Sequence, residues 1–106
     1  MKTNQLTRGH TRRVMYVENK DGDLDGADAR IGWVNFSKSG LSVYYRGRTL
    51  KRLGGDGCRG NYRDEASGEE FWVSGIKIRG SNGHYGTTSI AVDPDARDEY
   101  ARLRAR

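Results

Sequence analysis

The sequence predicts a mainly β fold, a small antiparallel six- to seven-stranded open barrel or sandwich with one C-terminal α-helix. The length of 106 residues suits a single folded unit. The chain contains 15 glycines and one proline, which indicates frequent turns between short strands. A hydrophobic fraction of 34% and a mean hydropathy of −0.90 favour one thin core. We expect residues 1–11 to form a mobile polar arm and residues 12–106 to form a single β-rich domain.

The N-terminal half predicts three strands. Residues 13–18 are rich in strand-forming side chains and end at the turn-prone residues 19–22. After an acidic loop, residues 30–37 carry apolar side chains at both odd and even positions, which face opposite sides of a strand. We therefore expect a central strand with both faces covered. Residues 38–40 supply a tight reversal. The strand that follows is predicted to bury alternate side chains, namely Leu41, Val43 and Tyr45.

The second half predicts a short strand at residues 48–53, an exposed glycine-rich loop at residues 54–60, and a hairpin. The hairpin pairs residues 61–64 with residues 69–73, because turn residues separate two runs that carry aromatic side chains. These segments add three further strands to the predicted sheet.

The C-terminal segment predicts one more strand, at residues 88–92, followed by a helix. Asp93 is placed to cap this helix, with Pro94 at its first position. An apolar stripe of Ala96, Tyr100 and Leu103 is then expected to pack on the sheet. The predicted core residues are Trp33, Phe36, Val43, Phe71, Val73, Tyr100 and Leu103.

Positive charge concentrates in the middle of the chain. The formal net charge is +5 and the pI is about 9.6, which favours acidic partners such as nucleic acid. Residues 37–63 contain seven basic residues and one acidic residue, a net charge of +6. Tyrosines are interleaved with these cations, as a surface for single-stranded nucleic acid requires. The alternative interpretation is an ordinary basic face balanced by the acidic residues of segments 21–28 and 64–70.

The leading functional hypothesis is a non-enzymatic binding module with RNA or DNA as its ligand. The predicted nucleic-acid-binding residues are Tyr44, Arg46, Arg48, Lys51, Arg52, Tyr62 and Arg63. The alternative is a protein-interaction or inhibitor domain that uses a sheet edge or the loop of residues 75–86 to bind a protein partner. The ligand candidates in that loop are Lys77, Arg79, His84 and Tyr85.

The acidic loop contains the only candidate metal ligands that the sequence suggests. Asp21, Asp23 and Asp25 alternate as in the opening of a calcium loop. Gly32 stands at the twelfth position, where such a loop needs a bidentate glutamate, and strands are predicted on both sides. We therefore expect a solvated acidic turn and no bound metal.

The sequence predicts no catalytic residues and no cofactor. Residues 55–57 and Asn82 superficially match the diphosphate and magnesium motif of thiamine diphosphate enzymes, which need two large α/β domains that this length excludes. An enzyme that works through Cys58, His84 or nearby carboxylates is the third interpretation, and the only possible imidazole partners of Cys58 are His10 and His84. The lone cysteine and the absence of a long apolar run lead us to expect a cytoplasmic protein without a membrane segment.

Several segments resemble a family of short bacterial proteins of uncharacterised function. The resemblance rests on residues 14–20, 29–34, 44–48, 72–75 and 95–100 and spans residues 12–103. Members of that family often bear the name 1-deoxy-D-xylulose-5-phosphate synthase, although the synthase itself is a large thiamine diphosphate enzyme. The resemblance implies a bacterial origin and supplies no catalytic residues.

Overall fold

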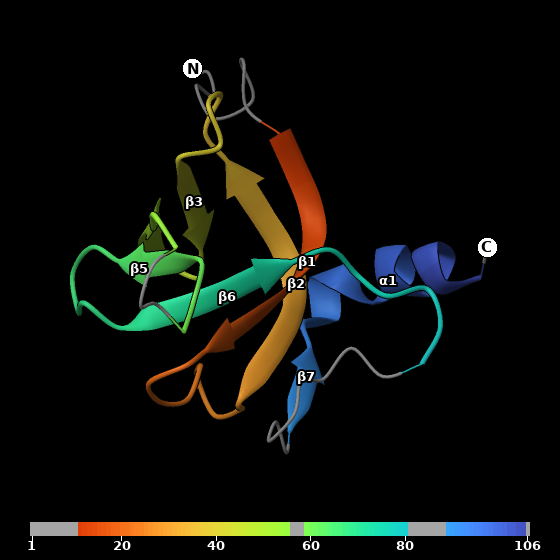
Figure 1. The fold of residues 1–106 in the computed structure, drawn as a ribbon. Helices are drawn as coiled ribbons and strands as arrows, with labels where there is room; N and C mark the ends of the chain where they lie inside the picture. The colour runs from red at the N-terminus through yellow and green to blue at the C-terminus, as the bar shows by residue number, and fades with distance from the viewer. Residues whose placement is uncertain (1–10, 56–58, 81–88, 106) are drawn as a thin grey trace.

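Six antiparallel strands close into a barrel, and a seventh strand and a C-terminal helix lie outside it (Figure 1). The computed structural model describes residues 11–55, 59–80 and 89–105. The elements are β1 (Thr11–Asn19), β2 (Ala29–Phe36), β3 (Ser42–Tyr45), β4 (Arg48–Arg52), β5 (Tyr62–Asp64), β6 (Glu70–Ser74), β7 (Ile90–Val92), a 3-10 turn (Pro94–Ala96) and α1 (Arg97–Arg104). The predicted mainly β fold with one C-terminal helix is confirmed.

Consecutive strands pair from β1 through to β6, the pairing of β6 with β1 closes the barrel, and the longest pairing joins β1 and β2. This pairing runs from Thr11 opposite Phe36 to Glu18 opposite Ala29. The second edge of β2 is shared, because β3 pairs with its end at Asn35 and Phe36 whereas β7 pairs in parallel with its start. The prediction of a central strand is thus confirmed. The barrel is closed, whereas the sequence predicted an open barrel or a sandwich.

The barrel interior is the main core, because alternate side chains of every strand point inward. The buried residues of this cluster include the predicted Val43, Phe71 and Val73, and Met15 and Phe36 pack against it from less buried positions. The full buried set is Val17, Leu24, Val34, Val43, Tyr45, Leu50, Tyr62, Phe71 and Val73.

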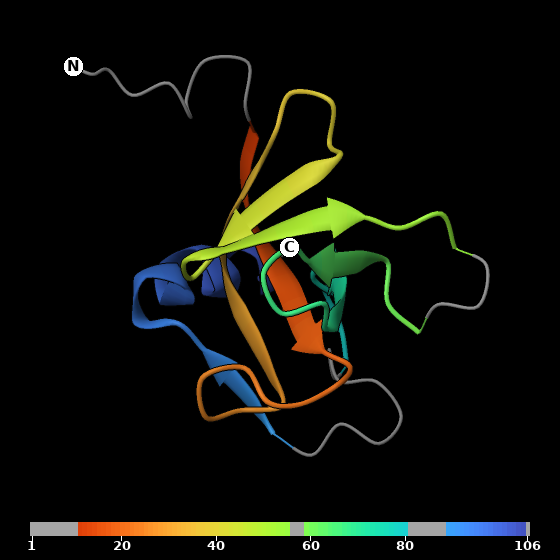
Figure 2. The same cartoon turned by 90° about the vertical axis from the view of Figure 1, so that its left-hand side faces the viewer.

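A second core lies outside the barrel, between β1 and β2 on one side and α1 and β7 on the other. Figure 1 shows α1 on the side of β1 and β2 away from β3 and β5, and Figure 2, viewed from the β3 side, shows it behind the barrel. The predicted stripe packs here, with Ala96 fully buried and Tyr100 and Leu103 partly buried. Trp33 is also partly buried in this cluster, in which Val14, Tyr16 and Ile31 are buried.

Two local predictions are corrected by the structure. The buried face of β3 begins at Ser42, and Leu41 is 61% exposed because it still belongs to the β2–β3 turn. Asp93 precedes a 3-10 turn, and its side chain forms no capping hydrogen bond. The carboxylate instead faces the barrel, where it binds side chains that are distant in sequence.

Part of the predicted arm and loops lies outside the described residues. Residues 1–10 and 81–88 are among those omitted, whereas Thr11, expected in the arm, is the first residue of β1. Within the described ranges, no helix is long and apolar enough to cross a membrane.

Candidate functional site

The acidic loop, residues 20–28, meets the β3–β4 turn at one end of the barrel. Leu24 and Ala27 exchange backbone hydrogen bonds around Asp25 and Gly26, whose φ values are 50° and 94°. The β3–β4 turn likewise has positive φ at Arg46 (47°) and at the glycine that follows. Positive φ at both central residues is characteristic of type I′ turns. The two turns are joined by the Arg46 Nε to Asp25 Oδ2 contact of 2.7 Å.

Carboxylates already neutralise two of the predicted phosphate-binding arginines. The Arg48 guanidinium donates to Asp25 at 3.1 Å and lies 3.9 Å from the buried Asp64. Hydrogen bonds from Arg48 and Arg46 lower the pKa of Asp25 from 3.8 to about 2. Arg46 and Arg48 therefore already have a carboxylate partner in the folded protein, and a phosphate that bound them would have to displace Asp25.

We predict that Asp25 makes the protein sensitive to acid. A carboxyl whose pKa is lower in the folded than in the unfolded chain contributes stability above its unfolded pKa of 3.8 and loses it as the pH falls towards about 2. Asp25→Asn should therefore have a lower Tm than the native protein at pH 6, and the two Tm values should converge between pH 5 and pH 2. Glu70, whose pKa is lowered by the N–H groups of Gly60 and Arg59, titrates in both proteins. A Tm difference that does not change with pH would contradict the prediction.

Asp93 is the buried centre of the same end of the barrel. Its side chain is 7% exposed, and it accepts hydrogen bonds from Tyr45 at 2.5 Å, Arg30 at 3.1 Å and Arg46 at 3.3 Å. Burial and the bond to Asp93 raise the pKa of Tyr45 far above its ordinary value. Gly32 leaves the space for this cluster, since a Cβ there would lie 2.1 Å from Asp93 Oδ2. The carboxylate is neutralised within the fold, which makes this a structural cluster.

A different group of predicted and unpredicted residues shares the outer face of the barrel. The strand registers place Arg12 opposite Asn35, Asn35 opposite Tyr44, and Tyr44 opposite Thr49. These four side chains form one row across β1, β2, β3 and β4, which we call the outer row. Beside it lies a hollow of about 350 Å³, the outer hollow, lined by Trp33, Asn35, Tyr44, Tyr45, Arg46, Gly47, Arg48 and Thr49.

One end of the outer row carries a stacked cation and ring. The Arg12 guanidinium lies 4.1 Å from the centre of the Trp33 ring. The Trp33 indole N–H donates to the Asp95 carbonyl at 2.9 Å, which fixes the ring. A guanidinium stacked by its face keeps its N–H edges free to donate. The half-buried Tyr44 ring supplies the second aromatic group of the row.

The remaining predicted residues divide between surface and core. Lys51 and Arg63 are exposed and face each other across β4 and β5, whereas Arg52 is exposed beside Tyr62. Tyr62 is only 3% exposed and its hydroxyl donates to the Gly40 carbonyl at 3.1 Å. Tyr62 is thus a core residue that has no ring face to offer to a base.

Only some of the loop candidates and acidic residues can be placed in the described structure. Lys77 and Arg79 are exposed on the segment after β6, whereas His84, Tyr85 and Cys58 lie outside the described residues. Asp21 pairs with Arg59, and Asp23 accepts the Gly26 N–H at 2.9 Å. In the part of the chain that the structure describes, no group of three histidine, cysteine or carboxylate side chains could hold a metal ion.

Sequence reasoning missed Arg12, Trp33 and Asn35 as members of a surface site. A polar Asn35 between the apolar residues Val34 and Phe36 was the available signal, because a polar residue there marks an outward position. Comparison with known families, curated proteins and solved structures gives no match to this chain.

Proposed function

We propose that the protein is a non-enzymatic module that binds single-stranded nucleic acid across the outer row. The observation that carries this proposal is the register that aligns Arg12, Asn35 and Tyr44 on one face. Each residue supplies one component of such a site. Tyr44 can stack on a base, the Asn35 amide can donate to and accept from a base edge, and Arg12 can bind phosphate.

Exposed cations next to the row extend the path of a nucleic-acid backbone. Lys51 lies 3.6 Å from Glu65, and both side chains are at least half exposed. Arg63 lies 3.5 Å from Glu70 and is also half exposed. Surface pairs of this kind are worth at most about 1 kcal/mol, so a phosphate can replace the carboxylate. The cations that support the proposal are therefore Arg12, Lys51 and Arg63.

The test is fluorescence anisotropy of a labelled single-stranded RNA and a duplex DNA, titrated at several salt concentrations. Contacts from three cations to a single strand predict a slope of log affinity against log salt of roughly −2. Tyr44→Ala should weaken single-strand binding by roughly fivefold to a hundredfold, the loss expected for one stacked base. Lys51→Ala should make the salt slope shallower by about 0.7.

The matched control is Arg97→Ala, which removes the same charge from an exposed position on α1. This variant should bind as the native protein does. Arg46→Ala and Arg48→Ala are unsuitable variants because they break the pairs with Asp25. Equal weakening by Tyr44→Ala and Arg97→Ala, or no binding at low salt, would contradict the proposal. Co-purification of one defined protein that survives nuclease would then favour the protein-interaction alternative.

A further inference from the structure

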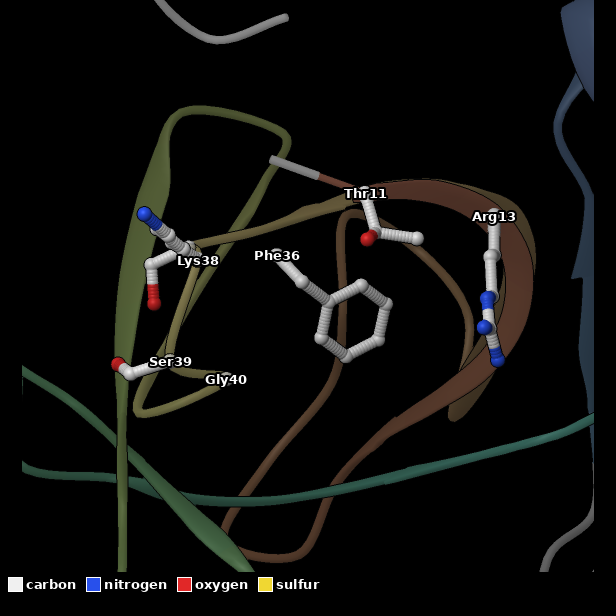
Figure 3. A pocket seen from close by; sticks show the side chains of 7 residues that line it. Thr11, Arg13, Phe36, Lys38, Ser39 and Gly40 are labelled. Atoms are coloured by element: carbon white, nitrogen blue, oxygen red, sulfur yellow. The ribbon is translucent and has the colours of Figure 1, made fainter. Parts of the chain in front are cut away.

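A second pocket lies at the mouth of the barrel, the end at which β1 begins and β2 ends (Figure 3). It has a volume of about 260 Å³ and is lined by Thr11, Arg13, Phe36 and the turn of residues 37–40. In Figure 3 the Phe36 ring projects between Thr11 and Arg13 on one side and Lys38 on the other. We call this space the mouth pocket. It lies at the end of the barrel opposite the Asp93 cluster.

The two cations of the mouth pocket have no acidic partner among the residues that the structure describes. Among the described residues, neither Arg13 nor Lys38 forms an ion pair, and the described lining includes no carboxylate. The arginines at the other end of the barrel differ in this respect, since Arg30, Arg46 and Arg48 all contact Asp25 or Asp93. Charge in the described structure is therefore balanced at one end and left unbalanced in the mouth pocket.

The hydroxyl groups of the β2–β3 turn accept backbone N–H groups and keep their own protons to donate. Ser37 Oγ accepts the Ser42 N–H at 3.0 Å, and Ser39 Oγ accepts the Leu41 N–H at 3.2 Å. A serine hydroxyl has one proton and two lone pairs, so a hydroxyl that accepts from the backbone keeps its proton for another acceptor. The pocket thus combines two cations with hydroxyl donors, and an anion with several oxygens satisfies both.

We propose that the mouth pocket binds the phosphate group of a small ligand that carries a planar ring, of the nucleoside monophosphate class. Phosphate is favoured because its oxygens can bind a guanidinium, an ammonium and hydroxyl groups together. The Phe36 ring between the cations provides a face on which a planar ring stacks. The small volume excludes a larger ligand from complete burial.

The first experiment is an NMR titration of the full chain with inorganic phosphate, with the ionic strength held constant by sodium chloride, following the backbone amide signals of residues 37–40. We expect these signals to shift in a saturable way with up to tens of millimolar phosphate. Arg13→Ala and Lys38→Ala should each weaken binding roughly tenfold or more, because each removes a charged hydrogen-bond donor. Arg97→Ala, an equal loss of charge on α1, should leave it unchanged. No shift at these residues, or equal weakening by all three variants, would overturn the proposal.

The second experiment tests the ring by comparing adenosine monophosphate with ribose 5-phosphate. The nucleotide should bind more tightly to the native protein, and Phe36→Leu should reduce that advantage while phosphate binding persists. Equal binding of the two ligands by the native protein would overturn the assignment of a planar ring. This inference is independent of the outer row, since Tyr44→Ala leaves the mouth pocket intact and oligonucleotide binding can fail while phosphate binding succeeds.

Discussion

Asp93→Ala is expected to lower the free energy of unfolding by about 3–5 kcal/mol, the usual cost of removing one partner from a buried ion pair. The side chain is 7% exposed and holds Tyr45, Arg30 and Arg46 together. Without it, the Tyr45 hydroxyl loses its partner and the Arg30 guanidinium keeps a charge with no carboxylate beside it. A domain of this size has only about 5–15 kcal/mol of stability in total, so the variant should be close to unfolding at 37 °C.

Urea unfolding followed by tryptophan fluorescence measures this effect. Asp95→Ala is the matched control, because Asp95 lies in the same 3-10 turn and is exposed. It should change stability by less than about 0.5 kcal/mol. Asp93→Asn keeps an acceptor for Tyr45 and should fall between the two. Equal stabilities of Asp93→Ala and Asp95→Ala would show that the cluster contributes nothing to the fold.

The elements that were predictable from the sequence are those whose partners are near in the chain. The hairpin of β5 and β6 was recognisable because turn residues separate two aromatic runs, and it pairs as expected. Closure of the barrel depends on β1 pairing with β2 along one edge and with β6, which is distant in the sequence, along the other. No local pattern specifies such an arrangement, which is why the sequence left an open barrel and a sandwich as alternatives.

The same distinction between local and distant partners applies to the residues of the candidate site. Tyr44 could be placed on an outer face because Val43 and Tyr45 alternate with it in a strand. Tyr62 lies in a strand of only three residues, which is too short for an alternating pattern to show whether Tyr62 faces the core or the solvent. Asp93 before a proline matched a helix cap, but its carboxylate is drawn to Arg30, 63 residues away in the chain. Tertiary electrostatics overrode the local preference.

Gly60→Ala should be among the most disruptive substitutions of the glycines that the structure describes, with a loss of at least about 3 kcal/mol. Gly60 is buried against β6, and a Cβ there would lie 2.3 Å from the Phe71 carbonyl oxygen. That oxygen accepts the Asn61 N–H at 2.9 Å, so the backbone cannot shift without breaking the entry to β5. The reason for the loss is a backbone collision, which no change of side-chain rotamer relieves.

Gly54→Ala provides the matched control for this prediction. It lies on the same connection between β4 and β5, and a Cβ there would meet no atom within 4 Å. Because its φ is not in the left-handed region, alanine should be neutral or slightly stabilising through a smaller entropy of the unfolded chain. Thermal unfolding of both variants separates a backbone collision at Gly60 from a general effect of replacing glycine by alanine in this connection. A similar Tm for both would mean that β6 tolerates a side chain at Gly60, and the close approach of the loop to β6 would then not be required for the closed barrel.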